Sequence, residues 1–288
     1  MWEYIFGWRS DRPNNHLVFG AAWALAMEHL RIAGYSGESV YEAYEEKFMP
    51  YYRSELSEDT DDLFSPKTPG NALLALRDYV LKYSDDFEKY KFLYTEISGT
   101  VPIDETRILH FRIDCIAEQQ KDGMKVVIDD KTTGGSFGRQ WLEQWTGSVQ
   151  MNTYTHALYC LYPFEEVRGA KIRGTRFLKT KRDFIDHPCW RSVDMMQQYL
   201  WNINAWVDSI DFEMERFSNC KDSDDVLRAF PQNPEACSKY FGCKFQDFCF
   251  AWRNPIQKYD YIPAGFMQNF WDPRQKPSTH KMELEWKA

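Results

Sequence analysis

The sequence VVIDDKTT, residues 126–133, begins as a β-branched apolar run and ends in two carboxylates and an ammonium. This composition predicts a buried strand with a charged tip. Successive side chains of a strand point to opposite faces, so Asp129 and Lys131 are expected on one face and Asp130 on the other. A second apolar stretch, FRID, ends in Asp114. If the two strands pair as a hairpin, Asp114 meets Asp129, and two carboxylates beside a lysine can bind a divalent metal and polarise a water.

A simpler interpretation makes these charges the solvated end of a strand before the turn at Gly134 and Gly135. The order of chemically useful residues around the strand favours the metal site. That order is Gly20, Glu28, Glu96, Asp114, Asp129-Asp130-Lys131, Gln150 and Tyr154. With it, the chain resembles the RecB-like branch of the PD-(D/E)XK nucleases, which includes the AddB nuclease domain and the CRISPR adaptation nucleases. The resemblance covers roughly residues 15 to 250.

The resemblance implies an α/β, restriction-endonuclease-like fold with a mixed central sheet flanked by helices. It implies a metal-dependent DNA nuclease of phage or prokaryotic origin in DNA end processing or recombination, and it favours an exonuclease over an endonuclease. Mg²⁺ or Mn²⁺ would be held by Asp114, Asp129 and the carbonyl of Asp130, and Lys131 would orient the attacking water. The alternative for Lys131 is a plain ion pair with Asp114.

Two further positions match the family. Gln150 and Tyr154 lie four residues apart and share one helix face, as in the family's Gln-x-x-x-Tyr beside the DNA strand. The alternative is a surface amide and a core aromatic. Glu96 fits an acidic position ahead of the second motif, or else an exposed strand glutamate.

One position departs from the pattern. The family's Gly-x-x-x-His-x-x-x-Glu maps onto Gly20 and Glu28, but its metal-binding histidine falls on Ala24. His29 cannot replace it, because five residues turn an α-helix side chain roughly 140° away.

The cysteines form a second signature. Cys237, Cys243 and Cys249 are spaced by five intervening residues and resemble the cysteine tail of iron–sulfur members such as AddB. Three thiolates in one loop suit a soft metal, so a [4Fe–4S] cluster or zinc is expected there. No cysteine precedes Cys115, so the family's upstream fourth ligand is not identified, and the other cysteines are expected to be buried thiols.

Composition limits the function classes. The net charge of −8 argues against broad adhesion to nucleic acid. The basic block from Arg168 to Arg182 contains no acid, and its Lys171, Arg173 and Arg176 are the predicted DNA phosphate contacts. The sequence contains no run of about 18 apolar residues, so no membrane span is expected. The start of the chain lacks the features of a signal peptide, so a cytoplasmic protein with reduced thiols is expected.

Hydrophobic periodicity predicts the order of elements. Helices are expected at about 20–28, from a capping box at Ser39, from Pro69 after the cap Thr68, at 137–161 and at 190–218. Strands are expected at about 91–98, 106–118, 124–131 and 167–178. A nuclease domain is predicted over 1–250, including the cysteine loop 237–249, and the tail 251–288 is predicted to wrap the surface. The aromatic residues 2–8 suggest a preceding segment.

Two other function classes remain. The first is a nuclease-derived nucleic-acid-binding or scaffold protein whose activity went with the missing histidine. The second is a partner-dependent subunit that docks through its aromatic tail. The retained Asp114, Asp129 and Lys131 favour the enzyme, since a scaffold has no physical need for two carboxylates beside a lysine.

Overall fold

The computed structural model describes residues 1–238, 242–275 and 278–283. The chain divides into two compact units. The sheet unit comprises Pro13–Tyr199 and Lys276–Ala288, and the aromatic unit comprises Met1–Arg12 and Leu200–Gln275. This division differs from the expected boundary at residue 250.

The aromatic unit joins the start of the chain to its later part. Strand β1 (Trp8–Ser10) pairs antiparallel with β7 (Phe266–Gln268). Phe6 and Trp8 are buried against Phe245 and Phe248 in one aromatic cluster. The apolar residues 2–8 therefore have their partners within this chain. The remaining elements of the unit are the end of α8 (Val193–Ser218), η4 (Pro234–Ala236), α9 (Gln246–Ala251), η6 (Pro255–Lys258) and η7 (Pro273–Gln275).

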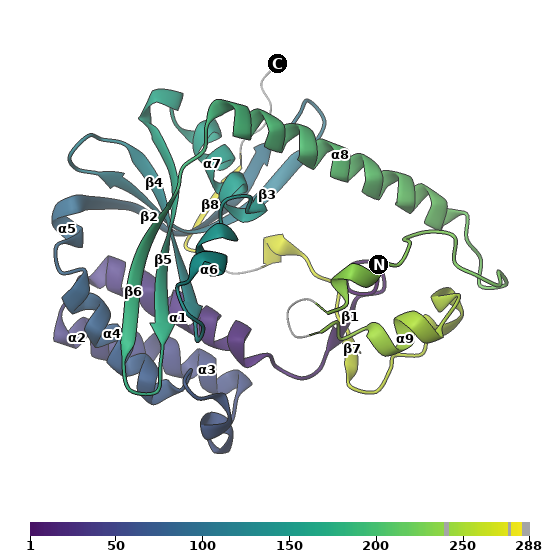
Figure 1. Cartoon of the computed structure of the whole chain (residues 1–288), viewed down its shortest axis with the longest axis horizontal. Coiled ribbons are helices and arrows are strands. Elements are labelled where there is room, and N and C mark those ends of the chain that lie inside the picture. Colours follow the sequence, from purple (N-terminus) through teal and green to yellow (C-terminus); the bar gives the residue numbers. More distant parts are fainter. Residues whose placement is uncertain (239–241, 276–277, 284–288) are drawn as a thin grey trace. The chain divides into compact units, whose positions relative to one another are not determined.

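A six-stranded mixed sheet with flanking helices makes the sheet unit an α/β fold, as predicted (Figure 1). The strands are β2 (Tyr90–Pro102), β3 (Ile108–Gln119), β4 (Lys125–Thr133), β5 (Val167–Phe177), β6 (Arg182–Cys189) and β8 (His280–Glu283). Their order across the sheet is β6-β5-β4-β3-β2-β8. The β4–β5 and β2–β8 pairs are parallel, and the others are antiparallel.

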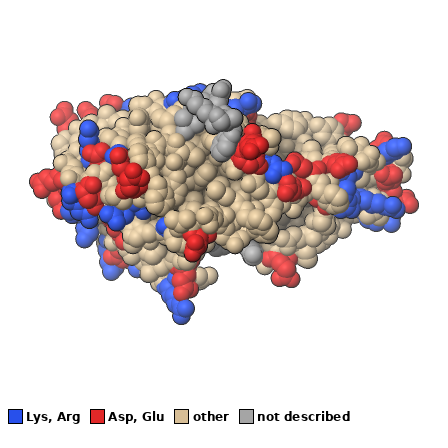
Figure 2. Space-filling view, turned by 90° about the horizontal axis from the view of Figure 1, so that it is seen from above, with Lys and Arg blue, Asp and Glu red and all other residues tan. Residues whose placement is uncertain are grey.

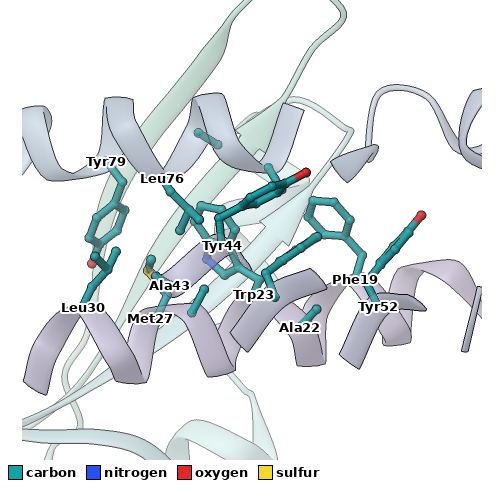
Figure 3. Close-up of a cluster of buried hydrophobic side chains, with 14 of the residues drawn as sticks. Phe19, Ala22, Trp23, Met27, Leu30, Ala43, Tyr44, Tyr52, Leu76 and Tyr79 are labelled. Atoms are coloured by element: carbon teal, nitrogen blue, oxygen red, sulfur yellow. The ribbon is translucent and has the colours of Figure 1, made fainter. Parts of the chain in front are cut away.

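Helices cover both faces of the sheet. One face carries Val127, which packs in a cluster with Met151 and Leu158 of α7 (Val149–Leu161). On the other face lie α1 (Asn15–Ala33), α2 (Gly37–Glu42), η1 (Ala43–Phe48), α3 (Met49–Glu55) and α4 (Pro69–Lys82) (Figure 1). Figure 3 shows Trp23 and Met27 of α1 directed toward Leu76 of α4 in their common core. The shorter elements are η2 (Glu58–Phe64), α5 (Asp86–Lys89), α6 (Arg139–Glu143) and η3 (Phe164–Glu166).

The helix starts show which local signals were sufficient. Thr68 caps α4 as predicted, with its side chain accepting a hydrogen bond from the amide of Asn71. The capping box predicted at Ser39 is wrong. Ser36 caps α2, and its side chain accepts from the amide of Ser39. Ser36 lies just before the helix, so its hydroxyl reaches the free amides first.

Three other predictions fail locally. The helix expected over 137–161 is two helices, because Gly147 and the cap Ser148 interrupt it. Strand β6 was not predicted, and the expected surface tail contains β7 and β8. Within the described residues, no helix is both long and apolar enough to cross a membrane.

Candidate functional site

The tip of β4 separates its charged side chains onto two faces, as its alternation predicted. On one face the ammonium of Lys131 lies 2.6 Å from Oδ2 of Asp129. On the other, Arg31 of α1 donates to Oδ2 of Asp130. The Arg31 and Asp130 side chains are each only 1% exposed, whereas that of Lys131 is 28% exposed. The pair of Arg31 and Asp130 is sealed in the protein, and the pair of Lys131 and Asp129 reaches solvent.

The hairpin of β3 and β4 brings Asp114 to this tip. The paired register runs from Glu118 opposite Lys125 to Ile116 opposite Val127. Beyond that point the Asp114 carboxylate accepts a hydrogen bond from the Asp130 amide at 3.2 Å. The expected hairpin forms, and Asp114 acts on Asp129 through its charge while it bonds to the backbone of Asp130.

Asp129 is the most unusual carboxylate of the site. It is fully buried, its Oδ2 is ion-paired with the Lys131 ammonium at 2.6 Å, and the Tyr154 side chain is a further hydrogen-bond partner. Burial raises the pKa of Asp129 to about 7; the charge of Lys131 opposes this shift and that of Asp114 reinforces it. A buried carboxylate is costly unless a cation or donor pairs with it, and Lys131 offsets only part of that cost.

Helix α7 supplies the two residues predicted from their spacing. The amide of Gln150 donates to the hydroxyl of Tyr154 at 2.9 Å. Tyr154 is buried, and its pKa is raised by burial first and then by the charges of Asp129 and Asp114. Gln150 is exposed. The helix therefore places a tyrosine beside the carboxylates and an amide at the rim.

Glu96 belongs to the same group of acids, which resolves the choice that the sequence left open. It is 4% exposed and forms an ion pair with Arg112 at 2.7 Å. Burial, followed by the charge of Asp114, raises the pKa of Glu96 to about 7. Its φ of +47° is rare for a residue with a side chain and costs of order 1 kcal/mol. The fold thus holds Glu96 in an unfavourable conformation next to Asp114.

Helix α1 carries Ala24 on the same side as Arg31. Seven residues separate Ala24 from Arg31, which brings the two onto nearly the same side of the helix. Arg31 reaches Asp130, and Glu28 lies between them along that side. Sequence reasoning missed Arg31. Its signal was a lone arginine in the apolar stripe that also contains Met27 and Leu30.

The oxygen donors at the tip of β4 are of the kind that binds a hard divalent cation, but they are not arranged as a complete coordination sphere. No group of three His, Cys, Asp or Glu side chains in the described part of the chain is arranged to hold a metal. The predicted set needs only the carboxylates of Asp114 and Asp129 and the carbonyl of Asp130. The charge of Asp114 raises the pKa of Asp129, and an ion held by both carboxylates would remove that repulsion.

The predicted phosphate contacts do not suit that role. Arg173 is 1% exposed and is held by Asp86 at 2.5 Å and by Asp186 at 3.1 Å. Lys171, which is 5% exposed, donates to Asp186 and to Tyr90. A buried cation already paired with carboxylates cannot neutralise a phosphate, so we correct the expectation for these two residues.

Arg176, the third of these residues, also has an acidic partner, because it lies 3.2 Å from Asp183. Figure 2 shows acidic and basic residues interspersed on the face in view. The basic block of the sequence is thus matched by acids from other segments.

The three predicted cysteine ligands share one cavity of the aromatic unit. Cys237, Cys243 and Cys249 line a space of about 670 Å³, together with Trp2 and Trp252. The amide of Cys243 donates to the carbonyl of Cys237 at 2.9 Å. They do not form a three-ligand metal group in the described structure, so a cluster or zinc here stays a prediction.

Comparisons with known proteins assign no family. No family model matches the chain, and no curated protein matches it. A solved structure titled "Crystal structure of SSO0001" matches over 65% of this chain and 74% of that chain, with 14% identity and a TM-score of 0.28.

Proposed function

We propose that this chain is a metal-dependent DNA nuclease of the RecB-like, PD-(D/E)XK type, acting in DNA end processing or recombination. The observation that supports it most is Asp129, a fully buried carboxylate whose pKa is raised by burial and further by the charge of Asp114. Asp114 lies beside it, and an ammonium that reaches solvent lies 2.6 Å away. Two carboxylates held close together in the interior repel each other unless a cation lies between them.

Each residue has a separate task in this proposal. Asp114 and Asp129, with the carbonyl of Asp130, hold Mg²⁺ or Mn²⁺. When bound, the ion supplies a nucleophilic water and neutralises charge on the phosphoryl oxygens. Lys131 orients that water or stabilises charge that develops on the phosphoryl group.

Tyr154 and Gln150 form the DNA-facing side of the site. Tyr154 excludes bulk water from Asp129, because it is buried against the carboxylates. The exposed Gln150, fixed through the Tyr154 hydroxyl, offers an amide to a DNA strand beside the metal. This pairing explains why the two residues share one helix face.

The test is cleavage of end-labelled linear single- and double-stranded DNA with Mn²⁺, Mg²⁺ or EDTA. Wild-type protein should cut in either metal and not in EDTA. The variants Asp129→Asn and Lys131→Ala should each be slower by about a hundredfold or more, the scale of a lost electrostatic contact. Closed circular DNA should resist if the enzyme requires an end.

Glu166→Gln is the matched control. Glu166 is an exposed acid of the same unit and lies 3.3 Å from Lys125, outside the site. It should cut like wild type. Wild-type protein that cuts no DNA in either metal overturns the proposal, and Asp129→Asn protein that cuts at the wild-type rate overturns the site.

A further inference from the structure

The last strand of the sheet comes from the end of the chain. Strand β8 runs parallel to β2, with Ile97 opposite His280 and Gly99 opposite Met282. The Ser98 hydroxyl donates to that of Ser278 at 2.8 Å. A segment some 180 residues away in sequence thus closes the edge of β2 that carries Glu96.

Gly99 makes this pairing possible. A Cβ atom there would lie 1.9 Å from the carbonyl oxygen of Met282, a distance that no real contact allows. The φ of Gly99 is not in the left-handed region, so its backbone conformation does not require glycine. The close approach of β8 does require glycine, which indicates that the sequence of β2 is adapted to receive this strand.

Thr279, just before β8, contacts two acids of the candidate site. Its amide donates to the carbonyl of Glu96 at 3.1 Å. Its hydroxyl donates to the carboxylate of Glu28 on α1, a residue 251 positions away in sequence. One residue therefore ties together the strand and the helix that bring these acids to Asp114.

We propose that Thr279 is a positioning residue of the candidate site, which fixes the Glu28 carboxylate and the unfavourable backbone of Glu96 through the added strand β8. This inference rests on the proposed nuclease function for its catalytic consequence. The contacts themselves do not depend on that function. Residues that hold the surroundings of metal ligands typically contribute about 10- to 100-fold in metal affinity or activity.

Two substitutions at Thr279 separate its hydroxyl from its shape. Thr279→Val keeps the backbone amide and the branched side chain but loses the bond to Glu28, whereas Thr279→Ser keeps the hydroxyl. The matched control is Ser278→Ala, which removes only the hydroxyl paired with Ser98 on the same segment. Gly99→Val serves as a second route, since it displaces β8 without touching Thr279.

The measurements are Mn²⁺ binding by calorimetry, with the metal alone as the probe, and the kcat and KM of Mn²⁺-dependent DNA cleavage. We expect Thr279→Val to weaken Mn²⁺ binding and to lower kcat by about tenfold with KM unchanged. Thr279→Ser and Ser278→Ala should match wild type in both. Gly99→Val should lose at least as much as Thr279→Val.

The outcomes distinguish the two proposals. If wild type cuts DNA and Thr279→Val matches it in kcat and Mn²⁺ affinity, the role of Thr279 falls and the nuclease stands. If wild type binds Mn²⁺ more tightly than Thr279→Val but cuts no DNA, the nuclease falls and the role of Thr279 stands. A wild-type protein that binds no Mn²⁺ overturns both. An equal loss in Ser278→Ala would reduce Thr279 to general support of the strand, which also overturns the proposal.

Discussion

Asp129 and Asp130 are neighbours in sequence and both are buried, but the two faces of β4 treat them differently. Asp130 faces α1 and is paired with Arg31 in a contact that solvent hardly reaches. Asp129 faces α7 and is paired at 2.6 Å with Lys131, whose side chain is 28% exposed. The difference teaches that burial of a carboxylate is no guide to its role. An acid whose cation is sealed from solvent supports the fold, and an acid whose cation reaches solvent is available for chemistry.

The largest effect should come from breaking the sealed pair. Arg31→Met leaves the Asp130 carboxylate buried without its partner, and unfolding in urea should show a loss of about 3–5 kcal/mol. The double variant Arg31→Met with Asp130→Asn should recover much of that loss, because no lone charge remains. A single variant as stable as wild type would show that the α1 face of β4 is not held by this pair.

A smaller effect, of opposite sign, is expected on the other face. The pKa of Asp129 is raised from its ordinary 3.8 to about 7, chiefly by burial. The stability that comes with its protonation is fully present below about pH 3.8 and is lost as pH rises through about 7. In EDTA at pH 8, Asp129→Asn should therefore be more stable than wild type by about 2 kcal/mol, because burial costs the ionised Asp129 more than its pair with Lys131 returns.

Thermal unfolding in EDTA across pH 4 to 8 measures that difference. It should shrink as pH falls toward 4, because wild type then protonates Asp129. A constant difference over this range would show that Asp129 does not titrate as its surroundings require. Added Mn²⁺ should raise the melting temperature of wild type and leave that of Asp129→Asn unchanged.

The smallest effect concerns the helix that faces Asp130. Ala24 lies on the same side of α1 as Glu28 and Arg31, where the family pattern has a histidine. Ala24→His should tighten Mn²⁺ binding by roughly tenfold, or about 1.4 kcal/mol, and Mg²⁺ binding less, because nitrogen ligands suit Mn²⁺ better. Calorimetry with both metals tests this. Unchanged affinities would place Ala24 away from the metal.

Sequence patterns predicted the parts of the site that local geometry controls. Strand alternation separated Asp129 from Asp130, the hairpin brought Asp114 to them, and helical spacing paired Gln150 with Tyr154. Each of these relations spans either one element or two adjacent strands. Over such short distances along the chain, the periodicity of side chains and the turn residues are sufficient to predict which residues meet.

The missed features depend on partners far away in sequence. Arg31 lies 99 positions from Asp130, and Thr279 lies 251 positions from Glu28. The basic block had the composition of a DNA contact, but Asp86, 87 positions from Arg173, takes up that arginine. The positive charge of a stretch of sequence does not show which acidic residues pair with it in the fold.

Strand β6 was missed for a local reason. Its sequence RDFIDHPC mixes charges with a proline and lacks a clear apolar alternation. The strand lies at the edge of the sheet, where one side of the backbone needs no partner and a proline is tolerated. Edge position is a property of the whole sheet, so the pattern could not reveal it.

The most direct test of the difference between the two faces of β4 is a calorimetric titration of Mn²⁺ into wild type, Asp129→Asn and the control Glu166→Gln. The account predicts that wild type and Glu166→Gln bind Mn²⁺ with equal affinity. Asp129→Asn should bind at least about a hundredfold more weakly, which corresponds to about 2.7 kcal/mol. Equal Mn²⁺ affinity in all three proteins would contradict the assignment of Asp129 as a metal ligand.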